Sequence, residues 1–111
     1  MEDILLAMDK IGQYTKNMSQ EEFKQTDIVI DAVIRNLEVI GEAAKSVPIE
    51  AREEYSHIPW KRMIGLRNIM IHEYFGIDLS IVWTTVKNNL PEARKHIDEM
   101  LTQTKRAETE G

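Results

Sequence analysis

The fold of this chain is decided by residues 28–47, which read IVIDAVIRNLEVIGEAAKSV. Their apolar side chains recur with helical spacing on two faces, which together cover most of the helix circumference. One face holds Ile30, Val33, Ile34, Leu37 and Ile40, and the second holds Val29, Ala32, Asn36, Val39 and Ala43. A helix that is apolar over so much of its surface belongs at the centre of a bundle or at a subunit interface. In so short a chain we expect both uses.

Helical spacing continues on the N-terminal side of this central segment. Residues 2–16 form one amphipathic helix. Ser19, followed three positions later by Glu22, has the capping-box pattern that starts a short second helix or turn. Asp27 is a candidate cap for the central helix, and Pro48 ends it.

The C-terminal side is also helical. Residues 49–55 are expected to form one or two turns, and a long helix over residues 59–74 begins with a first-turn proline. Asp78 is the expected cap of the last helix, which Pro91 must break or kink because proline lacks an N–H. From about residue 102 the tail is polar and is expected to fray.

Composition agrees with one helical domain over residues 1–111. The chain is 42% hydrophobic and 30% charged, and only 5 glycines and 3 prolines interrupt its helical periodicity. We predict an all-α fold: a small, mostly antiparallel helical bundle with four to five main helices and short connections.

The net charge, the cysteine count and the length of the apolar runs disfavour several classes of function. The formal net charge of -5 disfavours broad electrostatic capture of nucleic acid, although a local basic patch is compatible with it. The absence of cysteine excludes a disulfide, a thiolate nucleophile and a cysteine-ligated zinc. Met1 is followed by acidic residues, which argues against a secretory signal, and no apolar run approaches the roughly 18 residues of a membrane span. We expect a cytoplasmic protein with no membrane partner.

The chemistry-bearing side chains gather in residues 66–75, LRNIMIHEYF. On a regular helix Arg67 points along the middle of an apolar stripe, and Tyr74 returns to the same face. His72 lies roughly 140° around the helix from Arg67, beside Asn68. The three side chains surround one ligand only if the helix distorts near its end, or if a second protomer contributes its own copy. A twofold dimer is the economical form of the second arrangement.

Each of these residues also has a purely structural interpretation. Arg67 could pair with a carboxylate of the central helix, Glu38 or Glu42, or it could clamp a phosphate. The ion pair and the phosphate clamp are compatible if the carboxylate fixes the guanidinium in place for a ligand. His72 is either a surface residue or a proton-transfer group active near neutral pH. Tyr74 is either a core ring with its hydroxyl at the rim or part of the site.

A metal site receives no support from the sequence pattern. His72-Glu73 begins like a zinc-protease helix, but residue 76 is glycine where that motif needs a second histidine. His57 and His96 are far apart in sequence and have no ligand spacing around them, so we interpret them as surface or loop residues. We predict neither a metal nor a cofactor.

Four elements, in order, resemble the HepT-like ribonucleases, which are toxins built on the HEPN domain. Residues 67–74 are similar to the Arg-x4-His-x-Tyr motif of that family, with Arg67, His72 and Tyr74 in its three positions. The other elements are Ile40-Gly41-Glu42-Ala43 on the central helix, Ile58-Pro59-Trp60 at a helix start, and Ile77-Asp78 with Val82-Trp83 and Leu90-Pro91 on the last helix. Together they cover about residues 3–101.

The resemblance implies a HEPN-like homodimer in which the motifs of both protomers line a cleft, and metal-independent endoribonuclease activity. His72 would act as general base or acid at the ribose 2′-hydroxyl and the leaving oxygen. Arg67 would stabilise charge developing on the phosphate. Asn68 would orient His72 or bind a phosphate oxygen, and Glu42 would support Arg67. The substrate is RNA because DNA lacks the 2′-hydroxyl.

The resemblance also implies a partner. HepT-like toxins pair with a minimal nucleotidyltransferase (MNT) antitoxin in a type VII-like system, and the antitoxin inactivates them by AMPylation of the motif tyrosine, here Tyr74. Two alternatives remain: a non-catalytic helical partner or nucleotide-binding subunit of a minimal nucleotidyltransferase, and a purely structural dimer in which Arg67 only pairs with Glu42.

Overall fold

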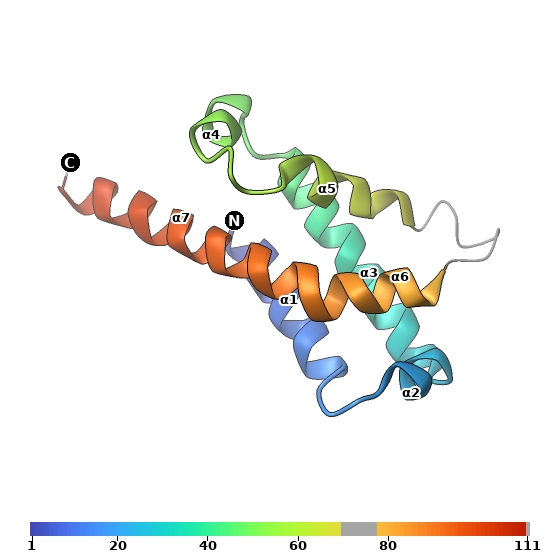
Figure 1. Ribbon diagram of the computed structural model, residues 1–111. Helices are drawn as coiled ribbons and strands as arrows, with labels where there is room; N and C mark the ends of the chain where they lie inside the picture. Colours follow the sequence, from blue (N-terminus) through green and yellow to red (C-terminus); the bar gives the residue numbers. More distant parts are fainter. Residues whose placement is uncertain (70–77, 111) are drawn as a thin grey trace.

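The computed structural model describes residues 1–69 and 78–110, with residues 69 and 108–110 described by their backbone alone. All the elements in these ranges are helical, as predicted (Figure 1). In chain order they are α1 (Glu2–Tyr14), α2 (Gln20–Lys24), α3 (Asp27–Lys45), α4 (Ile49–Glu54), α5 (Trp60–Gly65), the 3₁₀ turn η1 (Leu66–Ile69), α6 (Leu79–Thr84), the π-helical turn η3 (Thr85–Asn89) and α7 (Leu90–Glu110).

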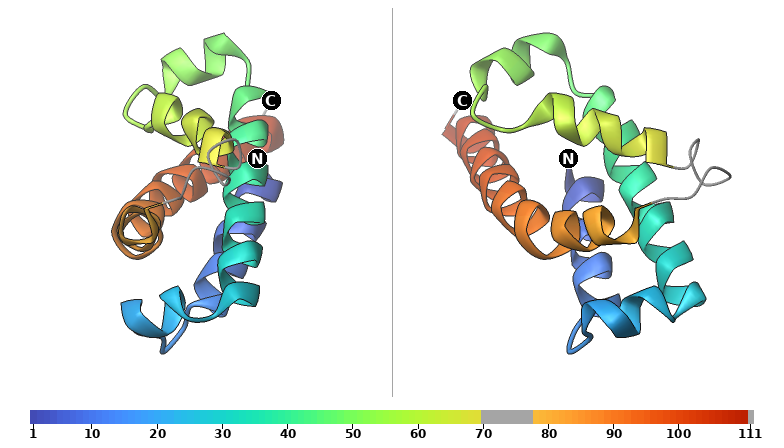
Figure 2. Two further views of the ribbon diagram at one scale, coloured as in Figure 1. Left: turned by 90° about the vertical axis from the view of Figure 1, so that its right-hand side faces the viewer. Right: turned by 45° about the vertical axis from the view of Figure 1, so that its right-hand side comes forward.

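Helix α3 is the central helix of the bundle. Helices α1, α2 and α5 and the turn η1 all pack against it, and Figure 2 shows it running between them. Its first predicted face is buried at Val33, Ile34, Leu37 and Ile40, while its second face is half-buried. The central position is therefore confirmed. Neighbours within one chain cover the first face and part of the second, so the width of this apolar surface does not itself require a dimer.

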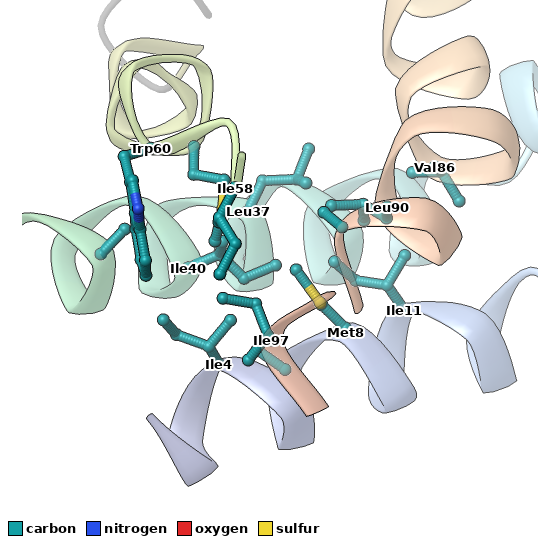
Figure 3. Packing of buried hydrophobic residues seen from close by; sticks show 14 of the residues in the cluster. Ile4, Met8, Ile11, Leu37, Ile40, Ile58, Trp60, Val86, Leu90 and Ile97 are labelled. Carbon is teal, nitrogen blue, oxygen red and sulfur yellow. The ribbon is translucent and has the colours of Figure 1, made fainter. Parts of the chain in front are cut away.

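The core joins segments that are far apart in the sequence (Figure 3). Helices α1, α3 and α7 contribute large aliphatic side chains, and Trp60 at the start of α5 closes one end with its indole N–H donating to the Tyr55 carbonyl at 3.1 Å. The labelled core residues are Ile4, Met8, Ile11, Leu37, Ile40, Ile58, Trp60, Val86, Leu90 and Ile97. Within the described residues, no helix combines the length and apolar character needed to cross a bilayer.

Two of the predicted helix starts are confirmed by their hydrogen bonds. The Glu22 N–H donates to the Ser19 hydroxyl at 3.1 Å and the Ser19 N–H donates to the Glu22 carboxylate at 3.0 Å, which completes the capping box. Asp78 caps α6 by accepting from the Ser80 N–H at 3.0 Å. Helix α4 supplies the short helical segment expected after Pro48.

The start of the central helix differs from the prediction. Thr26, and not Asp27, occupies the N-cap position, and no side chain caps the helix there. The Thr26 hydroxyl instead donates to the Glu22 carbonyl at 2.6 Å, so it satisfies the end of the preceding helix α2. Asp27 is the first residue of α3, where its negative charge interacts favourably with the positive end of the helix dipole.

The last helical run is distorted, not broken, near Pro91. The N–H of Leu90 bonds to the carbonyl of Thr85, five residues back, so the helix widens into a π turn immediately before the proline. Such a turn accommodates residues that cannot take part in the regular hydrogen-bond ladder. The helix then continues to Glu110, so the tail that we expected to fray is helical.

An ion pair fastens α7 to α1. Arg94 donates from Nε to Asp9 Oδ1 at 2.6 Å and from an Nη atom to Oδ2 at 3.2 Å, which is a two-point contact between guanidinium and carboxylate. Hydrogen bonding to Arg94, aided by its charge, lowers the pKa of Asp9 below its usual value. Both side chains are about half exposed, at 40% and 52%, so solvent screens the pair.

We expect the contribution of this pair to depend on pH. Because the folded-state pKa of Asp9 is lowered, the stabilisation is complete above the unfolded-state pKa of about 3.9 and is lost as pH falls through the folded-state value. Asp9→Asn should lower the free energy of unfolding by no more than about 1 kcal/mol at pH 7 and by almost nothing at low pH. Urea unfolding over a series of pH values measures this, and a difference that stays constant down to pH 2 would contradict it.

Candidate active site

Arg67 lies on η1 and reaches across to the central helix. Its Nη1 donates to Glu42 Oε1 at 3.2 Å. Glu38, the other candidate partner, lies instead 3.5 Å from Arg35 on its own helix. The Arg67 side chain is 34% exposed and that of Glu42 is 59% exposed, so the pair lies at the surface and the guanidinium remains accessible to a ligand.

The backbone around Arg67 is not a regular α-helix. Helix α5 ends at Gly65, and the chain tightens into the 3₁₀ turn η1 over Leu66–Ile69. A 3₁₀ helix turns by about 120° per residue instead of 100°, so positions projected on an α-helix do not hold over Leu66–Ile69. The prediction of one α-helix over residues 59–74 is therefore wrong over Leu66–Ile69, and its remainder, residues 70–74, lies outside the described residues.

The motif residues are thus only partly placed. Asn68 is exposed on η1, one residue after Arg67. His72 and Tyr74 lie outside the described residues, so their predicted positions relative to Arg67 stay predictions. The ion pair between Arg67 and Glu42 confirms one of the two partners that the sequence offered for the arginine.

Gly41 makes this ion pair possible. A Cβ atom built on Gly41 would lie 2.7 Å from the backbone nitrogen of Arg67, 3.0 Å from its Cβ and 3.1 Å from the Ile64 carbonyl oxygen. The backbones of α3 and η1 are therefore in direct contact, a spacing that only glycine permits. The next residue on α3 is Glu42, which this contact brings within reach of Arg67.

The sequence pattern indicated Gly41 only as part of the element Ile40-Gly41-Glu42-Ala43, and its packing role was not predicted. The signal in the sequence that could have indicated this role is a glycine inside an otherwise continuous helical pattern. A glycine there lowers helix stability by about 1 kcal/mol relative to alanine. Such a cost is tolerated where another segment must approach closely.

A cavity of ≈ 530 Å³ lies beside the segment that leads to Arg67. Arg62, Gly65 and Leu66 from the α5–η1 segment form one part of its lining, and residues of η3 and α7 form another. Its lining includes the cation Arg62, the carboxylate Glu92, two histidines and the neutral polar side chains of Thr85 and Asn89. Glu42 lines a separate, smaller hollow of ≈ 380 Å³ that also contains Asp3 and Glu38.

The same cavity brings together two histidines that the sequence kept apart. The ring centroids of His57 and His96 are 4.9 Å apart, with the ring planes at 85°. His57 is exposed in the turn between α4 and α5, as expected, whereas His96 is half-buried on α7 and is not a simple surface residue. Their contact depends on tertiary folding, so no local spacing could have indicated it.

The chain is similar to known proteins over nearly its whole length. Residues 4–100 match a family model described as "HepT-like: Ribonuclease HepT-like". A protein of Methanocaldococcus jannaschii named "Putative RNase MJ1216" is 48% identical over 99 residues, which is 89% of this chain and 82% of that protein.

Two further relatives come from other organisms. "Putative RNase TTE0752" of Caldanaerobacter subterraneus subsp. tengcongensis is 39% identical over 105 residues, 95% of this chain and 94% of that protein. "Probable ribonuclease HepT" of Thermococcus cleftensis is 36% identical over 100 residues, 90% of this chain and 91% of that protein. No solved structure shows a significant match.

The contact at Gly41 can be tested with a matched pair of glycine substitutions. Gly41→Ala should lower the free energy of unfolding by about 1–3 kcal/mol, because the new methyl group pushes η1 away from α3. Gly12→Ala on α1 is the control, since a Cβ there has nothing within 4 Å and alanine is the better helix former by about 1 kcal/mol. Urea unfolding compares the two, and equal stability of both variants would show that the close approach is not required.

Proposed function

This chain belongs to the HepT-like ribonuclease family, and we propose that it is an endoribonuclease acting as the toxin of a toxin–antitoxin pair. The observation that carries the proposal is the family match over residues 4–100, which spans the whole Arg-x4-His-x-Tyr segment. The described geometry adds that the motif arginine is held in place and still accessible.

In the proposed reaction the substrate supplies its own nucleophile. The ribose 2′-hydroxyl attacks the adjacent phosphorus, and the bond from phosphorus to the 5′-oxygen breaks. His72 takes the proton from the 2′-hydroxyl or gives one to the leaving oxygen, since imidazole exchanges protons near neutral pH. The proposed chemistry needs no metal ion, and it selects RNA over DNA because DNA lacks the attacking hydroxyl.

Arg67 would stabilise the negative charge that develops on the phosphate. Its side chain is 34% exposed and donates from Nη1 to Glu42, which leaves other N–H groups to face a phosphate oxygen. Glu42 restricts where the long arginine side chain can lie, so less side-chain entropy is lost when RNA binds. Asn68, the next residue on η1, would orient His72 or bind a second phosphate oxygen.

We also propose that two copies of the chain form the working unit. The motif segments of both protomers would then line one cleft, as a twofold axis allows. Support comes from large apolar side chains that stay exposed, above all Ile28 at the start of α3, 83% exposed, and Ile81 on α6, 64% exposed. Burying such side chains in a contact between protomers would be favourable.

The proposed partner is a minimal nucleotidyltransferase that acts as antitoxin. Transfer of AMP from ATP to the Tyr74 oxygen, with release of pyrophosphate and of the hydroxyl proton, would add a bulky anion a few residues from Arg67. The adenylate phosphate would then compete with RNA for the same guanidinium. Activity would be blocked without any change in the helical core.

The stability of an Arg67 variant distinguishes a purely structural ion pair with Glu42 from a catalytic role of Arg67. A buried ion pair would lose several kcal/mol when one partner is removed, but this pair is partly exposed. Arg67→Ala should therefore change the free energy of unfolding by less than about 1 kcal/mol. A folded variant that has lost activity would then be informative about catalysis.

We expect the purified protein to cleave RNA in the presence of EDTA. His72→Ala should lower the cleavage rate by about 100-fold or more, and Arg67→Ala should act similarly. Lys61→Ala, an exposed cation on α5 outside the motif, is the control and should cleave at close to the wild-type rate. The assay uses a panel of RNAs that includes tRNA, and a 2′-deoxy substitution at the cleaved position should prevent cleavage.

If wild type and His72→Ala are equally inactive on the whole panel, the ribonuclease proposal fails. The non-catalytic partner alternative then stands, and it predicts tight binding to the nucleotidyltransferase. Growth of cells that express the chain alone separates the two readings, since only the toxin causes arrest that depends on His72.

Co-expression with a candidate nucleotidyltransferase tests the proposed regulation. Intact-mass spectrometry should show added adenylate groups on the wild type and none on Tyr74→Phe. Tyr14→Phe is the control, because Tyr14 is 39% exposed on α1 and lies outside the motif. Adenylate groups retained on Tyr74→Phe and absent from Tyr14→Phe would place the modification elsewhere.

A further inference from the structure

Three potential metal ligands converge where the α4–α5 turn meets α7. One donor atom each from His57, His96 and Glu99 lies within 4.8 Å of the other two. His57 and Glu99 are exposed, so both can move, while His96 is half-buried on α7. His57 reaches this point from a different part of the chain, and the convergence is therefore a product of the tertiary fold.

The buried nitrogen of His96 is the second indication of a ligand. Its Nδ1 atom is inaccessible to solvent and has no hydrogen-bond partner among the residues that the structure describes. The nearest carboxylate oxygen, Glu99 Oε2, is 3.7 Å away, which is too long for a hydrogen bond. A buried polar atom without a partner costs free energy, and a bound cation would remove that cost.

Simple aromatic packing explains only part of this arrangement. The nearly perpendicular rings of His57 and His96 match an edge-to-face aromatic pair. Such packing requires neither a carboxylate one helical turn along α7 nor an unpaired ring nitrogen. Metal ligation accounts for all three features together.

The donor set indicates which metals fit. Two imidazoles and one carboxylate form a known three-ligand set for Zn²⁺. Imidazole nitrogens favour zinc and neighbouring transition metals over Mg²⁺ and Ca²⁺, which prefer oxygen. Ligand atoms around tetrahedral zinc are about 3.3 Å apart. The present separations of up to 4.8 Å would have to contract, which the exposed side chains of His57 and Glu99 allow.

We propose that His57, His96 and Glu99 bind one divalent transition-metal ion of the zinc type. The ion would join the turn before α5 to helix α7 at one wall of the ≈ 530 Å³ cavity. Helix α5 continues into η1, which carries Arg67, so the metal would also restrict the segment that positions the candidate active site. The three proposed ligands lie outside the Arg67–His72 motif in the sequence, and the metal proposal does not depend on the ribonuclease proposal.

Zinc binding to the untagged, EDTA-treated full chain tests the proposal. Titration with ZnCl2 against a chromogenic chelator should give one zinc per chain, and ZnCl2 should raise the melting temperature by several degrees. His57→Gln and Glu99→Gln should each weaken zinc binding by at least about tenfold. MgCl2 at the same concentration should produce neither effect.

Two variants serve as matched controls. Asp98→Asn removes an exposed carboxylate adjacent to Glu99, and His72→Gln removes the only histidine outside the cluster. Both should bind zinc as tightly as the wild type. His96→Gln should abolish zinc binding, and circular dichroism verifies that this variant folds. The test itself rests on the His57 and Glu99 variants, because these two residues are exposed.

Equal zinc affinity in the wild type, His57→Gln and Glu99→Gln would overturn the proposal. So would zinc binding that is lost in His72→Gln and unchanged in the other variants, because the metal would then be held elsewhere. Absence of zinc binding by the wild type would also overturn it.

Discussion

The backbone contact between α3 and η1 at Gly41 is the constraint on which the candidate active site depends. Without a side chain at this position, the chain around Arg67 can lie directly against the central helix, and Glu42 can then reach the guanidinium at 3.2 Å. Helix α3 is fixed by residues buried against α1 and α5. The position of Arg67 is therefore set by the core and not by the flexibility of a surface loop.

Partial exposure of the Arg67–Glu42 pair is a compromise between restricting the position of the guanidinium and leaving it accessible to a phosphate. A fully buried pair would be rigid but inaccessible to a phosphate, and removing one partner would endanger the fold. A free arginine would be accessible but would lose more side-chain entropy on binding. The Arg67 side chain, at 34% exposure, lies between these limits, although its carboxylate partner also reduces the positive field that a phosphate would meet.

Sequence patterns predicted the features that depend on local chemistry. The central position of α3 followed from its two apolar faces, and the caps at Ser19 and Asp78 followed from their spacing. The pairing of Arg67 with one of two glutamates also followed, because a cation in an apolar stripe needs a partner. The change to a 3₁₀ turn at Leu66 could not be predicted, since close packing against Gly41 accompanies it. The contact between His57 and His96 depends on the whole tertiary arrangement.

The π turn before Pro91 keeps the apolar side chains of the last helical run in one line. Val82, Val86 and Leu90 are buried at successive intervals of four residues. On a regular α-helix two such intervals would rotate the apolar stripe by about 80°. The wider turn at η3 absorbs much of this rotation, so the stripe continues into Ala93, Ile97 and Met100 without spiralling out of the core. The π turn η3 thus keeps the buried face of α6 aligned with the buried face of α7. Shortening η3 by one residue would rotate the buried face of α7 away from α1.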